Sequence, residues 1–166
     1  LQPGQTFSYN DVVGQRTKAN GFKEAGAYSG GQVVQEVGGG VCQVSSTLFS
    51  AILYTDLDVV ERANHSMPVH YVPSGMDATV FWDSPDFKFE NNHKYPVKIE
   101  MSVDSSSTLT VKIVGTKESD YTVVPRVEQT DEMSNVTYRD YKDANGNVVK
   151  TEAVCASKYK PLNSSN

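Results

Sequence analysis

The sequence has few of the residues on which disulfide scaffolds and metal sites depend. Its 166 residues include two cysteines and three histidines. Two cysteines are too few for a disulfide scaffold in a chain of this length. The chain also has no Cys-x-x-Cys or His-Glu-x-x-His motif, so its cysteines and histidines lack the spacing of a zinc site. We therefore expect no metal and no cofactor.

Long apolar runs and clusters of basic residues are also missing. No stretch reaches the roughly 20 apolar residues that a membrane span requires. The 15 basic and 20 acidic residues give a net charge of -5, whereas nucleic-acid binding needs clustered Lys and Arg. We expect no nucleic-acid partner and no membrane span in this chain. Because the sequence opens at Leu1 without Met, we expect a membrane anchor upstream in the full protein.

The spacing of apolar residues predicts an α+β fold. One amphipathic helix is predicted over about 42–54, because apolar residues recur there on one helical face at Val44, Leu48, Ala51 and Ile52. Alternating patterns predict strands over 6–9, 32–37, 58–62, 69–72, 78–82, 97–103 and 108–114. We expect this central helix to begin at the cysteine turn and to pack on a mainly antiparallel sheet.

The chain beyond residue 115 has a different character. Strand patterns are predicted over 121–128 and 138–141, and Asn145-Gly146 predicts a β-hairpin with a type I′ turn. We therefore expect two units, a main domain over 1–115 and a β-hairpin-rich extension over 116–166. The Ser/Asn tail at its end is expected to be disordered.

Cys42 lies in a setting that activates a thiol. Three glycines at 38–40 precede it, and the predicted helix follows it. The free N–H groups and the positive dipole end at a helix start stabilise a thiolate. The N–H groups around 41–43 are candidate oxyanion donors. We predict that Cys42 is a catalytic nucleophile, although a buried structural cysteine is the alternative that the residues leave open, and Cys155 fits that alternative better.

A cysteine nucleophile needs a base that takes its proton and later protonates the leaving amine. Histidine suits both steps because its pKa lies near neutrality. His65, in a polar turn after the helix, is the first candidate. His70, in an alternating apolar segment, is the alternative base, whereas His93 lies in an Asn-Asn-His-Lys turn that is expected to face solvent.

A third residue must orient the imidazole of the base. Asp77, just after a Pro-Ser-Gly turn, is the first candidate, and Asp83 and Asn64 stay open as alternatives. Asp77 would otherwise serve to cap that turn. The residues expected to contact the substrate or the oxyanion are Gly39, Gly40, Val41, Gln43, Ser45 and Ser46.

The segment around the cysteine resembles the VanW domain family. The resemblance rests on Val37-Gly-Gly-Gly-Val-Cys-Gln-Val-Ser-Ser-Thr-Leu48 and on the shorter segments 60–62, 65–68, 71–73 and 75–79, and it extends in weaker form over 1–115. It implies that 1–115 is a VanW-like catalytic domain. It also implies an extracellular protein at the cell wall or the outer face of the cytoplasmic membrane of a Gram-positive bacterium.

The same resemblance implies a peptidoglycan L,D-transpeptidase, an acyltransferase. Cys42 would attack the carbonyl of the third residue of a stem tetrapeptide, release the terminal D-Ala and hold the acyl group as a thioester. An amine of a neighbouring stem peptide would then form a 3-3 cross-link, so the partners are peptidoglycan stem peptides. Two alternatives remain, a cysteine peptidase or carboxypeptidase that acts on stem peptides and a non-catalytic cell-wall-binding module.

Overall fold

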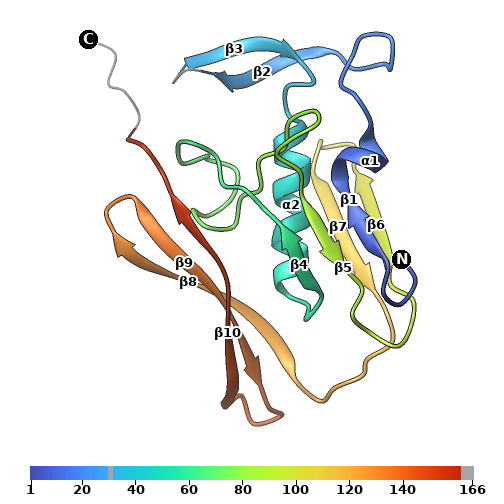
Figure 1. Cartoon of the computed structure of the whole chain (residues 1–166), viewed down its shortest axis with the longest axis vertical. Coiled ribbons are helices and arrows are strands. Elements are labelled where there is room, and N and C mark those ends of the chain that lie inside the picture. Colours follow the sequence, from blue (N-terminus) through green and yellow to red (C-terminus); the bar gives the residue numbers. More distant parts are fainter. Residues whose placement is uncertain (30–31, 162–166) are drawn as a thin grey trace.

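The structure is a computed structural model that describes residues 1–29 and 32–161. Within these residues the chain forms two helices, α1 (Tyr9–Val13) and α2 (Val41–Leu53), and neither is long and apolar enough to cross a membrane. It also forms ten strands (Figure 1): β1 (Thr6–Ser8), β2 (Glu24–Ser29), β3 (Gln32–Val37), β4 (Asp58–Glu61), β5 (Lys88–Glu90), β6 (Lys98–Val103), β7 (Leu109–Val114), β8 (Thr122–Asp131), β9 (Ser134–Lys142) and β10 (Val148–Lys158). The predicted disordered tail falls on 162–166, outside the described residues.

The strands pair antiparallel in four small sheets. Two of the sheets have three strands, ordered β1-β5-β4 and β10-β9-β8, and the other two are the hairpins β2-β3 and β6-β7. The strand-rich α+β class agrees with the prediction, but the expected sheet is divided. The predicted hairpin over 97–114 is confirmed, with β6 and β7 in continuous register.

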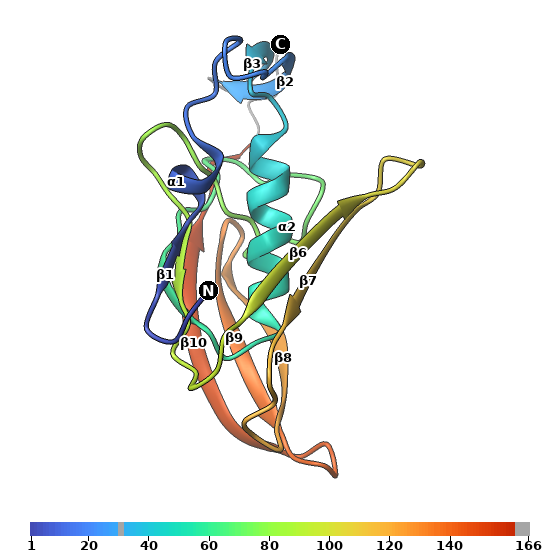
Figure 2. The same cartoon turned by 90° about the vertical axis from the view of Figure 1, so that its right-hand side faces the viewer.

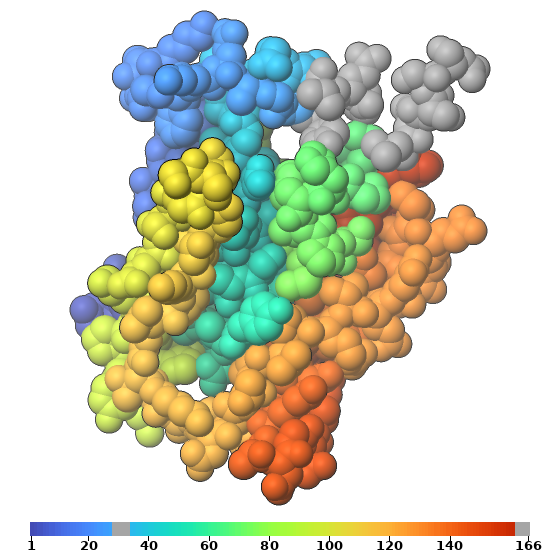
Figure 3. Space-filling model, turned by 180° about the vertical axis from the view of Figure 1, so that it is seen from behind, coloured from blue at the N-terminus to red at the C-terminus, as the bar shows by residue number. Residues whose placement is uncertain are grey.

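Helix α2 supplies much of the hydrophobic core. Its buried apolar face consists of Leu48, Phe49, Ile52 and Leu53, which pack with Phe87 and Phe89. The hairpin β6-β7 covers another side of the helix (Figure 2), and the space-filling view shows α2 between this hairpin and the segment that follows β4 (Figure 3). Each buried Leu or Phe side chain stabilises the fold by about 1.5–3 kcal/mol. The core therefore holds α2, and with it the cysteine at its start, in a fixed position.

The prediction of strands over 69–72 and 78–82 is wrong. These residues form bends and irregular backbone with a single antiparallel bridge, between Ala63 and Thr79. Side chains of α2 replace the strand partners: the hydroxyls of Ser45 and Ser46 donate to the Ala78 carbonyl at 2.7 and 3.3 Å. The Ala78 N–H in turn donates to Ser46 Oγ at 3.0 Å. Because these bonds satisfy the buried backbone, the segment needs no neighbouring strand.

The strands β8, β9 and β10 form a separate sheet after Gly115 (Figure 1). The hairpin at Asn145-Gly146 is confirmed, but the type I′ turn is not: Gly146 has a φ of 84° while Asn145 lacks the positive φ that this turn requires. The Asp143 carboxylate stabilises the turn instead, by accepting from the backbone N–H of Asn145 at 2.9 Å. The end of β10 returns to the first 115 residues and contacts the segment 62–77.

Candidate active site

Cys42 is the second residue of α2. The residue before the helix, Gly40, has a φ of 87° and no side chain that caps the helix. Glycine adopts this left-handed conformation without strain, so the chain turns abruptly into the helix. The preceding Gly39 lies against β2, where a Cβ atom would come within 2.3 Å of the Ala25 carbonyl oxygen. The glycine run therefore brings the cysteine to an uncapped helix start.

The N–H groups at this helix start are unequally engaged. Val41 and Gln43, two of the predicted oxyanion donors, donate to the carbonyls of Gly38 and Gly40 at 3.2 and 3.0 Å. Within the part of the chain that the structure describes, the N–H groups of Gly40 and Cys42 have no acceptor. An uncapped helix start favours an anion. The available oxyanion donors are therefore the N–H groups of Gly40 and Cys42.

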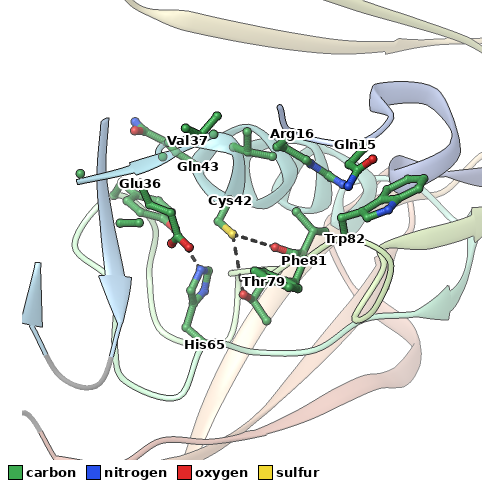
Figure 4. Close-up of a pocket in the computed structure, with 18 of the residues that line it drawn as sticks. Gln15, Arg16, Glu36, Val37, Cys42, Gln43, His65, Thr79, Phe81 and Trp82 are labelled. Atoms are coloured by element: carbon green, nitrogen blue, oxygen red, sulfur yellow. Dashed lines mark hydrogen bonds between the residues drawn. The ribbon is translucent and has the colours of Figure 1, made fainter. Parts of the chain in front are cut away.

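The thiol of Cys42 is half-buried and has polar neighbours on one side (Figure 4). Sγ donates to the Val80 carbonyl at 3.4 Å and lies 3.7 Å from Thr79 Oγ1. Burial alone would raise the pKa of Cys42, but the hydrogen bond and the charge of His65 outweigh burial and lower this pKa below its ordinary value of 9.0. Cys42 thus forms a thiolate more readily than an ordinary cysteine.

His65 lies beside Cys42 and contacts Asp77. Its Nδ1 is 2.7 Å from Asp77 Oδ2, and its Nε2 is 3.2 Å from the Tyr71 hydroxyl. Burial would lower the pKa of His65, yet the hydrogen bonds to Asp77 and Cys42 raise it to about 9. A protonated imidazole beside a thiol with a lowered pKa favours a thiolate–imidazolium pair.

The Asp77 carboxylate is completely buried among hydrogen-bond donors. Oδ2 accepts from the backbone N–H of His65 at 2.7 Å, and Oδ1 accepts from the Tyr159 hydroxyl at 2.6 Å and from Arg62 Nη2 at 3.0 Å. Burial would raise the pKa of Asp77, but the bonds from His65 and Tyr159 and the charge of Arg62 hold it below its ordinary value. Asp77 is therefore an ionised acceptor, which keeps a proton on Nδ1 of His65 and directs Nε2 into the cavity.

The other candidates for base and orienting residue have different surroundings. His70 lines the same cavity, with its ring 5.6 Å from that of Tyr71. His93, expected in solvent, is instead 18% exposed and pairs with Asp56 at 2.7 Å, because two carboxylates flank it. Among the alternatives to Asp77, Asn64 donates to the carbonyls of His65 and Lys158, and Asp83 is exposed.

Ser45 and Ser46 do not reach the cavity, contrary to the prediction that they contact the substrate. Both are fully buried, and their hydroxyls bind the backbone of Ala78. They lie one turn after Cys42 on the face of α2 that packs inward. Their role is to fasten the helix start to the segment that carries Asp77.

Two residues that the sequence analysis did not assign to the site, Tyr159 and Arg62, hold Asp77. Tyr159 accepts from the Gly75 N–H at 2.7 Å and donates to Asp77. Arg62 donates through Nε to the Asp77 carbonyl at 2.6 Å and through Nη1 to Ser157 Oγ at 2.8 Å. Arg62 lies within the segment 60–62 that carries the family resemblance, so the sequence already pointed to it. Tyr159 lies 82 residues from Asp77, and no local pattern marks it.

A cavity of about 720 Å³ opens over these groups. The start of α2 forms its floor, the hairpin β2-β3 forms one wall, and the segment 79–82 forms another (Figure 4). Cys42, His65 and Thr79 point into it together (Figure 4). Gly39, Gly40, Val41 and Gln43 also line it. The arrangement places a thiol with a lowered pKa, an imidazole with a raised pKa and an uncapped helix start around one cavity.

We expect iodoacetamide to alkylate Cys42 faster than Cys155 at neutral pH. The pKa of Cys42 is lowered, so thiolate is present below pH 9.0, whereas burial raises the pKa of Cys155. The Cys42 rate should fall as the pH drops through its lowered pKa, and His65→Ala should move that fall to higher pH. Peptide mass spectrometry measures both rates, and equal rates at the two cysteines would contradict a lowered pKa.

A family profile and two relatives match parts of the chain. The family profile described as "VanW like protein" matches residues 1–114. The chain is 50% identical over 97 residues, or 58% of its length, to "Uncharacterized protein YoaR" of Bacillus subtilis. It is 29% identical over 120 residues, or 69% of its length, to "Vancomycin B-type resistance protein VanW" of Enterococcus faecalis. These matches span 32% and 42% of the two relatives, less than half of either. No solved structure matches the chain.

Proposed function

The chain belongs to the VanW family, and from this premise we propose that it is a cysteine-dependent L,D-transpeptidase of peptidoglycan. The observation that supports the proposal is the placement of Cys42 at an uncapped helix start, beside a His65 that is held by a buried Asp77. Acyl transfer needs a nucleophile, a proton shuttle and a site for an oxyanion, and this cavity provides candidates for all three.

The first half of the reaction forms a thioester. The Cys42 thiolate attacks the carbonyl carbon of the third residue of a stem tetrapeptide, and the N–H groups of Cys42 and Gly40 bind the negative oxygen of the tetrahedral intermediate. As the C–N bond breaks, Nε2 of the His65 imidazolium gives its proton to the departing nitrogen of D-Ala. The products are an S-acyl enzyme, a neutral His65 and free D-Ala.

The second half transfers the acyl group. An amine of a neighbouring stem peptide attacks the thioester, and neutral His65 takes the proton that the amine loses. The new amide is the 3-3 cross-link, and the released thiolate restores the pair with the imidazolium. Water in place of the amine would release a tripeptide, which is carboxypeptidase activity.

Asp77 orients His65 in both halves and stabilises its positive form, as an acid does in a catalytic triad. The bonds of Asp77 to Tyr159 and Arg62 place it in a buried network that includes β10. We therefore assign catalysis to 1–115 and a supporting role to the extension 116–166, which supplies Tyr159. Family membership supports a cell-wall-associated protein, and the substrate requires that the domain act outside the cytoplasmic membrane.

Product analysis tests this function. The protein is incubated with a stem tetrapeptide that ends in D-Ala, with and without an excess of an acceptor amine. The products are then separated and identified by mass spectrometry. The proposal expects release of D-Ala and an amide between the acceptor and the third residue. Tripeptide as the sole product would support a hydrolase, and an unchanged tetrapeptide would contradict both enzymes.

A further inference from the structure

Arg16 is a cation in the same cavity as Cys42 (Figure 4). It lies in the segment between α1 and β2, and the structure gives it contacts that hold the guanidinium in place. Its Cβ and Cγ pack on Gly38, where a Cβ atom would come within 2.8 Å of Arg16 Cβ. Its guanidinium lies 5.7 Å from the centre of the Tyr9 ring. One of the glycines before Cys42 thus makes room for this arginine.

Arg16 donates a hydrogen bond to a neutral acceptor. Arg16 Nη2 donates to Asn10 Oδ1 at 2.7 Å. Asn10 is buried, and its Nδ2 donates to the carbonyls of Phe81 and Asp83 at 2.9 and 3.0 Å. The amide of Asn10 is therefore fixed with its oxygen toward Arg16. This bond positions the guanidinium and leaves its charge uncompensated.

The guanidinium also has an unused donor. Arg16 Nη1 is buried and has no hydrogen-bond partner among the described residues, and within 1–29 and 32–161 no carboxylate lies within 4.0 Å of Arg16. A buried unpaired donor of a charged group costs stability unless a ligand satisfies it. An arginine fork matches the two oxygens of a carboxylate. An anion of this shape would satisfy the unpaired Nη1 donor.

Tyr9 lies between Arg16 and the start of α2. Its hydroxyl donates to the carbonyl of Val41, the residue before Cys42, at 3.3 Å. Burial raises the pKa of Tyr9 to about 12, with the charge of Arg16 opposing the rise and that of Cys42 adding to it. Both charges therefore act on one hydroxyl. Because Arg16 and Cys42 line one cavity, a peptide bound there can contact both residues.

We propose that Arg16 binds the C-terminal carboxylate of the donor peptide and so restricts the enzyme to cleaving off a single terminal residue. The inference rests on the proposed function. In a tetrapeptide the free carboxylate is one residue beyond the carbonyl that Cys42 attacks, a reach of about 3.5 Å along the chain. A longer peptide would place an amide, which carries no charge, at Arg16.

Binding to a protein that cannot react tests this inference. The probes are two synthetic stem tetrapeptides that differ only in a C-terminal acid or primary amide, and calorimetry measures their affinity for Cys42→Ala. We expect the acid to bind about tenfold more tightly than the amide, as for a charge-assisted hydrogen bond. Adding Arg16→Gln should lower the affinity for the acid to that for the amide. Arg16→Lys should keep part of the difference in affinity between the two peptides.

Lys18→Gln is the matched control, because Lys18 is an exposed cation of the same segment that pairs with Glu24 at 2.7 Å. It should leave the preference for the acid intact. Equal losses of affinity for the acid and the amide in Arg16→Gln would overturn the inference. A preference for the acid that survives in both Arg16 variants would overturn it as well. Because the test involves no thioester, an Arg16-dependent preference would stand even if Cys42 proved not to be a nucleophile.

Discussion

Replacement of Cys42 with alanine is expected to abolish release of D-Ala and formation of cross-links. Removing the nucleophile of a covalent mechanism lowers kcat by about 10⁴-fold or more, since what remains is binding and oxyanion stabilisation. Cys42→Ser should fall almost as far, because an alkoxide does not form beside His65 as readily as a thiolate. Initial rates of D-Ala release, measured with saturating tetrapeptide, report the loss.

The fold should survive this change. Cys42 is half-buried at the edge of the hydrophobic core, so its replacement by alanine is expected to cost only about 1 kcal/mol, which thermal unfolding measures. Cys155→Ala is the matched control and should keep full activity, because Cys155 lies in β10 and outside the cavity. Full wall-related function in Cys42→Ser would contradict the enzyme and favour a cell-wall-binding module.

Replacement of Asp77 with asparagine is expected to lower both kcat and stability strongly. The amide offers Nδ1 of His65 no charged acceptor, so the imidazole loses the tautomer that directs Nε2 at the substrate, and kcat should fall by about 10⁴-fold. The change also leaves the guanidinium of Arg62, whose side chain is 2% exposed, without its counter-charge. Breaking one partner of a buried ion pair costs about 3–5 kcal/mol, so urea unfolding should show a large loss of stability.

Two companion variants separate the two roles of Asp77. Asp83→Asn should change neither stability nor rate, because Asp83 is exposed and does not contact His65. Tyr159→Phe removes the hydrogen bond to Oδ1 and the acceptor of the Gly75 N–H, and it leaves the bond between Asp77 and His65 in place. It should cost about 1.5–3 kcal/mol with a much smaller loss of kcat. A rate for Asp77→Asn close to that of the unchanged protein would contradict the orienting role.

The parts of the site that the sequence revealed are those encoded locally. The glycine run and the apolar spacing after it placed Cys42 at the start of α2, because helix starts and amphipathic faces depend on residues a few positions apart. The pairing of His65 with Asp77 joins two residues 12 positions apart. Chemistry narrowed that choice to a few candidates, and only the fold distinguishes Asp77 from Asp83 and Asn64.

The site residues that could not be predicted are brought together by contacts between distant parts of the sequence. Tyr159, the residue after β10, contacts Asp77, and Asn10 and Gly38 hold Arg16 at the cavity. The alternation of apolar residues over 78–82 looked like a strand, but it reflects burial against α2, whose serines satisfy the backbone. Periodicity reports which side of a segment is buried, and it does not report which partner satisfies the backbone.

The most direct test of the account is the mass of the acyl-enzyme. The unchanged protein is mixed with a stem tetrapeptide, quenched in acid within milliseconds to seconds and weighed intact, and the adduct is then mapped by digestion. We expect a gain in mass equal to that of the tetrapeptide minus D-Ala. The adduct should be carried by Cys42, be lost on treatment with hydroxylamine and be absent from Cys42→Ala. Cross-linked product that forms without an adduct, or with an adduct on a residue other than Cys42, would contradict it.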